Sequence, residues 1–182
     1  SAAEETAQLP LAVRRMMVDY DKGLELLEKE RYIDALAAFR RVLAAAETVK
    51  EQDALVLVST AANNAGNILL MQGKLEEAEA SYRQALKADP RHAMAMNNLG
   101  AALLKQGKIS DAISAFSEAV KIDPQNGMAL NNLASLLLRA GELERAAKTL
   151  SASLKLNPKN EQTWQMMAQL YHMSGQPEKQ AG

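Results

Sequence analysis

One pattern of residue types occurs twice, 34 positions apart, in AMAMNNLGAALLKQGKISDAISAFSEAVKIDP (residues 93–124) and GMALNNLASLLLRAGELERAAKTLSASLKLNP (residues 127–158). In each stretch an apolar stripe with helical spacing ends at a glycine, Gly107 or Gly141, and a second stripe ends just before the final proline. Glycine adopts the left-handed backbone that ends a helix, and proline lacks the amide hydrogen that a continuing helix needs. Each stretch therefore predicts two consecutive helices joined by a tight turn.

The same period of 34 residues extends on both sides of these stretches. Small residues recur where paired helices are expected to approach closely, and Phe116 is expected to fill the space beyond Gly100 and Ala112. The sequence thus predicts helix hairpins that repeat along the chain. The repeated positions are held by Gly73, Gly107, Gly141 and Gly175; by Pro90, Pro124 and Pro158; by Ala78, Ala112 and Ala146; and by Gly66, Gly100, Ala134 and Ala168.

The N-terminal part follows the pattern with a different spacing. Gly23 and Phe39 stand 43 residues before their counterparts Gly66 and Tyr82, which leaves nine residues more than the regular period. The added residues include neither proline nor glycine, so we expect them to lengthen helices around a short connection near residues 50–53. The expected long helices cover residues 10–30, 32–47 and 53–72.

The regular stretches resemble the tetratricopeptide repeat family, whose signature of small and large residues they carry in order. In the first stretch the matching positions are Met96, Leu99, Gly100, Leu103, Ala112, Phe116, Ala119 and Pro124. The resemblance implies an all-α fold, a right-handed superhelix (α-solenoid) of about four and a half repeats in a single domain. We expect a divergent first hairpin at 10–47, a repeat with an extended first helix at 53–90, repeats at 93–124 and 127–158, and a C-terminal capping helix at 161–174.

The C-terminal segment departs from the pattern because Pro177 stands where a second helix would begin. We expect Trp164, Met167 and Tyr171 to lie on the inward stripe of the last helix. That helix would then serve as the terminal cap that repeat arrays need.

Composition and charge exclude several classes of function. The chain has no cysteine, and its 21 basic against 22 acidic residues give a net charge of -1, so neither thiol chemistry nor binding of nucleic acid is expected. No run of consecutive apolar residues approaches the ~18 that a membrane span needs. His92 and His172 have no partner at metal-ligand spacing, and we expect both to be exposed to solvent. The sequence therefore predicts no catalytic residue, no metal site and no cofactor, and the protein is not expected to be an enzyme.

Asparagine is unusually placed within the predicted first helices. Pairs at 63–64, 97–98 and 131–132 recur with the repeat, although each asparagine costs about 0.5–0.7 kcal/mol of helix propensity relative to alanine. At about 100° per residue, the second member of each pair lies on a stripe well away from the apolar one. By resemblance, these stripes would line one continuous concave groove. They comprise Thr60, Asn64, Asn67 and Met71; Met94, Asn98, Ala101 and Lys105; Met128, Asn132, Ser135 and Arg139; and Gln162, Met166, Gln169 and Met173.

Two interpretations of these asparagines are open. As register residues, Asn64, Asn98 and Asn132 would hydrogen-bond to neighbouring helices. As a ladder, they would offer amide donors and acceptors to the backbone of an extended peptide, as asparagines do in some members of the family. The methionines of the stripes would add an adaptable apolar surface. The predicted peptide-binding residues are Asn64, Asn67, Asn98, Asn132, Lys105, Arg139, Met94 and Met128.

A clamp for a partner's C-terminal carboxylate, known in the family, needs basic residues interleaved with asparagine. Here Asn63, Met94 and Met128 occupy the relevant positions. The basic residues of the stripes, Lys105 and Arg139, stand at the far ends of their helices. We therefore do not expect this clamp.

The direct interpretation is a non-catalytic adaptor or scaffold that holds a peptide or helix of a partner protein in its groove. The alternatives are a self-assembly module that forms a homo-oligomer, and a targeting domain of a larger protein. Charged residues on the second helices, such as Glu79 and Arg83, are interpreted as solvated surface.

Overall fold

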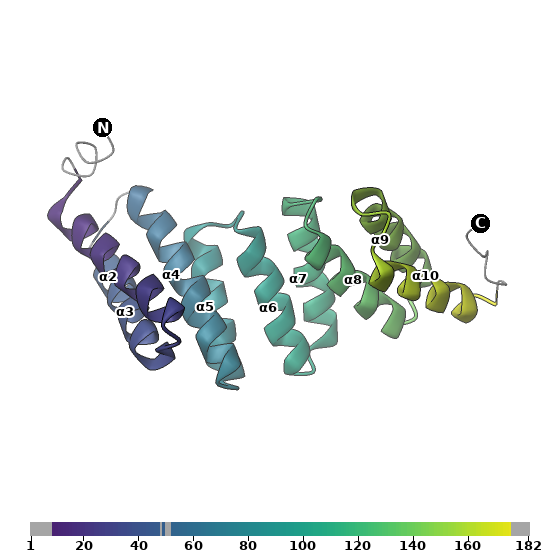
Figure 1. Ribbon diagram of the computed structural model, residues 1–182, viewed down its shortest axis with the longest axis horizontal. Coiled ribbons are helices and arrows are strands. Elements are labelled where there is room, and N and C mark those ends of the chain that lie inside the picture. Colours follow the sequence, from purple (N-terminus) through teal and green to yellow (C-terminus); the bar gives the residue numbers. More distant parts are fainter. Residues whose placement is uncertain (1–8, 48, 50–51, 176–182) are drawn as a thin grey trace.

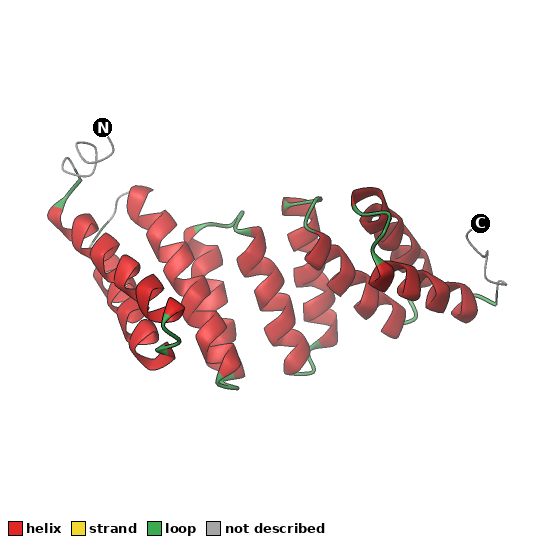
Figure 2. Cartoon of the chain, viewed as in Figure 1, coloured by secondary structure: helices red, strands yellow, loops and turns green. Residues whose placement is uncertain are grey.

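The computed structural model describes residues 9–47, 49 and 52–175. Throughout these residues the chain forms helices and turns without a strand (Figure 2). The first three helices agree within two residues at each end with those expected from the sequence. The helices are α2 (Leu11–Glu28), α3 (Tyr32–Ala46), α4 (Gln52–Met71), α5 (Leu75–Ala88), α6 (Ala93–Lys105), α7 (Ile109–Ile122), α8 (Gly127–Arg139), α9 (Leu143–Leu156) and α10 (Glu161–Met173).

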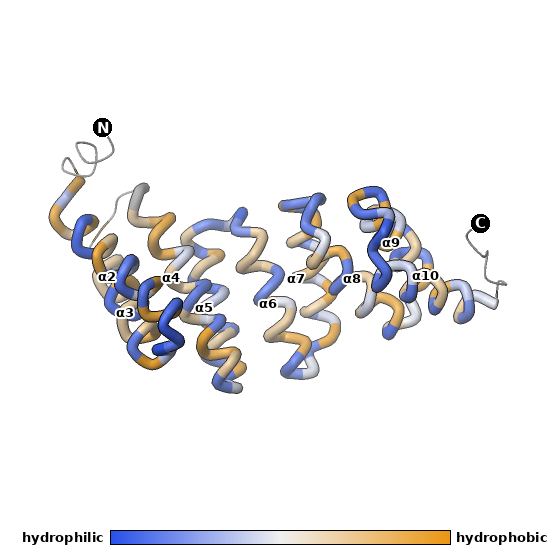
Figure 3. Tube along the Cα trace, in the orientation of Figure 1, coloured by the Kyte–Doolittle hydropathy of each residue, from blue (hydrophilic) through white to orange (hydrophobic). Residues whose placement is uncertain are grey.

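Consecutive helices pack against each other, and the pairs stack in one row from the N-terminal to the C-terminal end (Figure 1). First helices also touch one another directly, since α2 contacts α4, α4 contacts α6, and α8 contacts α10. Each helix places hydrophobic and hydrophilic residues on different faces (Figure 3). The predicted all-α superhelix is therefore confirmed.

The turns within the hairpins follow the predicted glycine chemistry. Gly107 has a φ of 76°, and the amide of Lys108 donates to the carbonyl of Leu103 at 2.9 Å, which closes the end of α6. The first hairpin forms the same turn without glycine. Glu30 has a φ of 56° there, and the amide of Arg31 donates to the carbonyl of Leu26 at 2.8 Å. This non-glycine residue in the left-handed region is a strained point of the fold.

The junctions between hairpins use an acidic or amide side chain before proline. Asp123 ends α7 in an extended conformation, and its carboxylate accepts a hydrogen bond from the amide of Gln125 at 3.1 Å. Asp89 and Asn157 form the same turn with the amides of the residues two positions on. Part of the connection expected near residues 50–53 lies outside the described residues, and α4 begins at Gln52.

The two helices of a hairpin meet where a small residue faces a large one 16 positions later. A Cβ built on Gly100 would lie 2.8 Å from Cδ1 of Phe116, closer than carbon atoms pack. Gly23 stands in the same relation to Phe39, and Gly66 to Tyr82. The rings therefore occupy the space that a side chain on the glycine would need, which brings the two helices close together.

One segment of the described residues, Ala54–Met71 in α4, is long and apolar enough to span a membrane by length and composition. More than half of this segment is buried inside the protein, at 56%. Its buried side chains belong to the core between α3, α5 and α6. Packing of the solenoid therefore accounts for its apolar character.

Candidate functional site

The eight predicted peptide-binding residues lie at equivalent positions of α4, α6 and α8, and we call them the first-helix stripe. Met94 and Met128, 34 residues apart, are both largely exposed. Lys105 and Arg139 are exposed at the ends of α6 and α8 and form no ion pair with any described residue. The stripe consists of Asn64, Asn67, Met94, Asn98, Lys105, Met128, Asn132 and Arg139.

Asn98 joins α6 to α4 through its side-chain amide. Its Nδ2 donates to Oδ1 of Asn63 and to Oδ1 of Asn67, both at 3.0 Å. Asn67 accepts a second hydrogen bond at Oδ1, from the hydroxyl of Tyr82 on α5 at 2.8 Å. Burial raises the pKa of Tyr82, so its hydroxyl keeps its proton and remains a donor. One amide therefore holds three helices in a fixed relation.

Asparagines form corresponding links further along the array. Nδ2 of Asn132 on α8 donates to Oδ1 of Asn97 on α6 at 3.1 Å. Oδ1 of Asn131 accepts from the hydroxyls of Ser153 on α9 at 2.9 Å and Thr163 on α10 at 3.1 Å. Both hydroxyls are buried, so these bonds satisfy groups that water does not reach.

These contacts match the register interpretation for the amide N–H groups of Asn98 and Asn132. The structure brings Asn67 and Asn98 together, whereas Asn64 forms no hydrogen bond through its side chain within the described part of the chain. No described residue engages Oδ1 of Asn98 or Asn132, so each keeps an acceptor for another molecule. The sequence interpretation did not assign the acceptors Asn63 and Asn97, although they recur with the same period one residue before the stripe.

Two expectations for α10 are wrong. Met166 was placed on the exposed face with Met94 and Met128, but it is only 8% exposed because α10 packs directly against both α8 and α9. Trp164 was placed on the inward stripe, but it is 44% exposed. No described helix covers the side of α10 on which Trp164 lies, and its indole N–H donates to the carbonyl of Pro158 at 2.8 Å.

His92 is also not the fully exposed residue expected from the sequence. It stands at the start of α6, half-buried, with Nδ1 2.7 Å from the hydroxyl of Ser59 on α4. Burial lowers the pKa of His92, while the nearby carboxylate of Asp89 acts in the opposite direction. His172 is exposed as expected. His92 thus has a structural contact that ties α4 to the α5–α6 junction.

Glu79 on α5 is not solvated surface, because its side chain is only 14% exposed. Its carboxylate accepts hydrogen bonds at 2.9 Å from Nζ of Lys108, Nε2 of Gln106 and Nε of Arg83. The Lys108 ammonium, followed by the other two donors, lowers the pKa of Glu79 from 4.5 to about 2 despite the opposing effect of burial. This cluster fastens α5 to the turn between α6 and α7.

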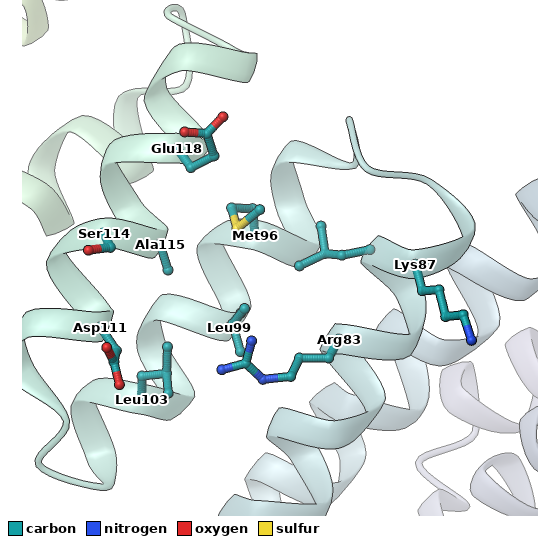
Figure 4. Close-up of a pocket in the computed structure, with 10 residues that line it drawn as sticks. Arg83, Lys87, Met96, Leu99, Leu103, Asp111, Ser114, Ala115 and Glu118 are labelled. Atoms are coloured by element: carbon teal, nitrogen blue, oxygen red, sulfur yellow. The ribbon is translucent and has the colours of Figure 1, made fainter.

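A surface cavity of about 610 Å³ lies between α5 and α7, with apolar residues of α6 between its walls (Figure 4). Lys87 and Arg83 stand on the α5 side, and Asp111 and Glu118 stand on the α7 side. Arg83 is already paired with Glu79, so the two walls differ little in net charge. Helical periodicity does not predict this cavity, because it depends on the separation of successive second helices.

Family models described as tetratricopeptide repeat match the chain over residues 14–91, 63–127 and 103–170. Together these matches extend from the first described hairpin into α10. Among curated protein sequences there is no significant match.

Solved structures share the fold at low sequence identity. A tetratricopeptide repeat protein from Parabacteroides merdae has a TM-score of 0.76 at 20% identity, covering 89% of this chain and 61% of its own. This chain therefore spans about three fifths of the length of that protein. MamA from Desulfovibrio magneticus has a TM-score of 0.73 at 17% identity, covering 88% of this chain and 86% of its own. The first TPR of Spaghetti (RPAP3), bound to an HSP90 peptide, has a TM-score of 0.63 at 22% identity, covering 66% and 95%.

Proposed function

The chain belongs to the tetratricopeptide repeat family, and from this membership we propose that it binds a peptide or helix of a partner protein along the first-helix stripe. The family is generally a non-catalytic interaction module, and the fold is that of a protein–protein interaction scaffold. The first TPR of Spaghetti (RPAP3), which has the same fold, is bound to a peptide. That complex supports a peptide as the ligand class for this chain.

The observation that carries the proposal is the pairing of a free acceptor with an exposed methionine in successive repeats. Asn98 and Asn132 use Nδ2 within the protein and keep Oδ1 for a ligand. A peptide backbone N–H is a suitable donor to such an oxygen, whatever side chain the peptide residue carries. Met94 and Met128 stand one turn earlier on the same helices and offer flexible apolar contact.

The proposal is tested by selecting peptides from a random displayed library on the whole chain and measuring their affinities by fluorescence polarisation. Asn132→Ala removes one acceptor and should weaken binding about two- to tenfold, by a similar factor for peptides of unrelated sequence. Met94→Ala and Met128→Ala should each weaken binding as well. Because asparagine and methionine are neutral, affinity should change little between low and moderate salt.

Leu156→Ala is the matched control, since Leu156 is an exposed apolar residue of α9 outside the stripe. It should leave affinity unchanged. The proposal fails if the selected peptides bind the combined Met94→Ala, Met128→Ala and Asn132→Ala variant as tightly as the unaltered chain. A steep loss of affinity with added salt also counts against it, because many ion pairs would then carry the binding.

The second candidate is self-assembly through the first hairpin. Val18 on α2 and Ile33 at the start of α3 are large apolar residues that are mostly exposed. Apolar groups on a surface favour association when they form part of a contiguous patch. Sedimentation velocity across a wide concentration range tests this function, with Val18→Ser and Ile33→Ser expected to abolish any association that is found.

A further inference from the structure

The face of α10 that carries Trp164 is the face on which earlier first helices hold their second helices. In α8 the equivalent residues 34 positions earlier are Leu130, Ala134 and Leu137, which are at most 1% exposed beneath α9. Their counterparts on α10 are Trp164, which is 44% exposed, and Ala168 and Tyr171, which are half-buried. We call Trp164, Ala168 and Tyr171 the α10 stripe. Within residues 9–47, 49 and 52–175, no helix covers it.

The α10 stripe is held in place from both sides. The indole N–H of Trp164 donates to the carbonyl of Pro158, which fixes the ring beside the α9–α10 turn. On the opposite face of the helix, Met167 and Leu170 are buried in the core. Little side-chain freedom is therefore lost when a partner covers the stripe.

The earlier hairpins show what kind of residue fits over each small residue. Where the first helix has glycine, as at Gly100, the second helix supplies an aromatic ring 16 residues later. Where the first helix has alanine, at Ala134, the residue 16 positions later is Leu150, and both are fully buried. A methyl group on the first helix takes the space of the ring, so an aliphatic side chain replaces it. Because residue 168 is alanine, the α10 stripe selects leucine in preference to phenylalanine or tyrosine.

A second small residue completes the pattern on the covering helix. Ala146 precedes Leu150 by four residues, and it is fully buried where α9 meets α8. In the chain's own sequence, Gln180 stands at the position that corresponds to Ala146, so residues 176–182 do not supply this motif.

We propose that the α10 stripe binds a helix of a partner protein that carries alanine and, four residues later, leucine. The partner helix lies on α10 as α9 lies on α8. Alanine allows close approach, and leucine packs on Ala168 between Trp164 and Tyr171. This surface is separate from the first-helix stripe, and the two proposals stand or fall independently.

The probe is a synthetic peptide of residues 142–158, which contains Ala146 and Leu150. Glu144 and Lys148 are exposed in α9 and lie 3.6 Å apart, so a lactam bridge between them stabilises the helix without touching its buried face. Trp164 is the one tryptophan of the chain, and the peptide has none, so emission reports directly on the stripe. Titration of the whole chain should give a saturable blue shift together with protection from iodide quenching.

An exchange of partners tests the size rule. The peptide with Leu150→Phe should bind the unaltered chain roughly tenfold more weakly. Ala168→Gly in the protein should reverse this preference, because it restores the room that a ring needs. Ala168→Glu should abolish binding, and Met128→Ala, on the first-helix stripe, should leave it unchanged. Circular dichroism of each variant confirms that the fold is retained.

Absence of a saturable shift would overturn the proposal, and so would equal affinity for the leucine and phenylalanine peptides. Emission of the protein alone separates the other occupants. If Trp164 is already shielded from iodide at every concentration, residues 176–182 cover the stripe. If the shielding disappears on dilution, a second copy covers it. Either result excludes a partner helix as the occupant.

Discussion

Gly100 and Phe116 form a matched pair in which the ring lies where a side chain on residue 100 would have to be. A Cβ at residue 100 would stand 2.8 Å from the ring, and Phe116 is almost completely buried. The distance between α6 and α7 is therefore set by the absence of one methyl group. Ala134 and Leu150 are the alternative solution to the same contact one repeat later.

Gly100→Ala should destabilise the protein, although alanine favours a helix. Overpacking costs about 1–3 kcal/mol and the gain in helix propensity returns about 1 kcal/mol, so a net loss of up to about 2 kcal/mol is expected. Adding Phe116→Leu should recover part of that loss, because it recreates the pairing of Ala134 with Leu150. Urea unfolding of both single variants and the double variant checks this. Strict additivity of the two changes would contradict the matched-pair explanation.

Glu30→Gly should stabilise the first hairpin. A left-handed conformation costs an ordinary residue about 1–2 kcal/mol, while the greater freedom of glycine in the unfolded chain offsets about 0.5–1 kcal/mol. A gain of about 0.5–1 kcal/mol is expected, measured as a higher urea midpoint. The reciprocal change Gly73→Glu, at the equivalent turn with a φ of 74°, should lower the midpoint. If both changes shift stability in the same direction, backbone strain is not the cause.

Asn98→Ala should cost more stability than Asn132→Ala. Asn98 is half-buried and its amide serves two acceptors, one of them on the buried Asn63. Its loss should cost about 1–2 kcal/mol after the gain in helix propensity. Asn132 is exposed and makes one such bond, so water replaces it and the cost should stay below about 1 kcal/mol. Denaturant melts that rank the two variants in the opposite order would contradict the register role of Asn98.

Glu79→Gln should lower stability at neutral pH by about 1–2 kcal/mol, because three donors then face a neutral amide. The pKa of Glu79 is lowered from 4.5 to about 2, so the unfolded chain takes up the proton first on acidification. Its contribution is therefore complete above pH 4.5 and disappears as the pH falls through about 2. Melts of both proteins between pH 7 and pH 2 should converge at the acidic end. Glu144→Gln, at an exposed pair, is the control and should have little effect.

The fold was predictable because its stops are local. Gly107 ends a helix through its own φ angle, and Pro124 blocks a helix through its missing amide, so neither depends on distant residues. The period then repeats these local decisions along the chain. Glu30 shows the limit, since its left-handed turn follows from its place in the repeat and not from its residue type.

The candidate site was predictable as a face but not as a set of contacts. Helical spacing identifies the stripe that contains Asn98, but the choice of Asn63 as its partner, instead of Asn64, depends on how α4 and α6 are rotated against each other. Glu79 was misread for a similar reason, since its donors Gln106 and Lys108 come from the following hairpin. Contacts between successive repeats are set by tertiary packing, which a single helix does not encode.

The asparagine links and the cavity lie on different sides of α6, and this has a mechanical consequence. Asn98 is well over a quarter turn away from Leu99 and Leu103, which border the cavity between α5 and α7. Hydrogen bonds therefore resist separation of the first helices, whereas little opposes a change in the spacing between α5 and α7. Under load the array should bend about the asparagine edge, with its curvature changing while its inner contour length stays constant, as in a strip stitched along one side.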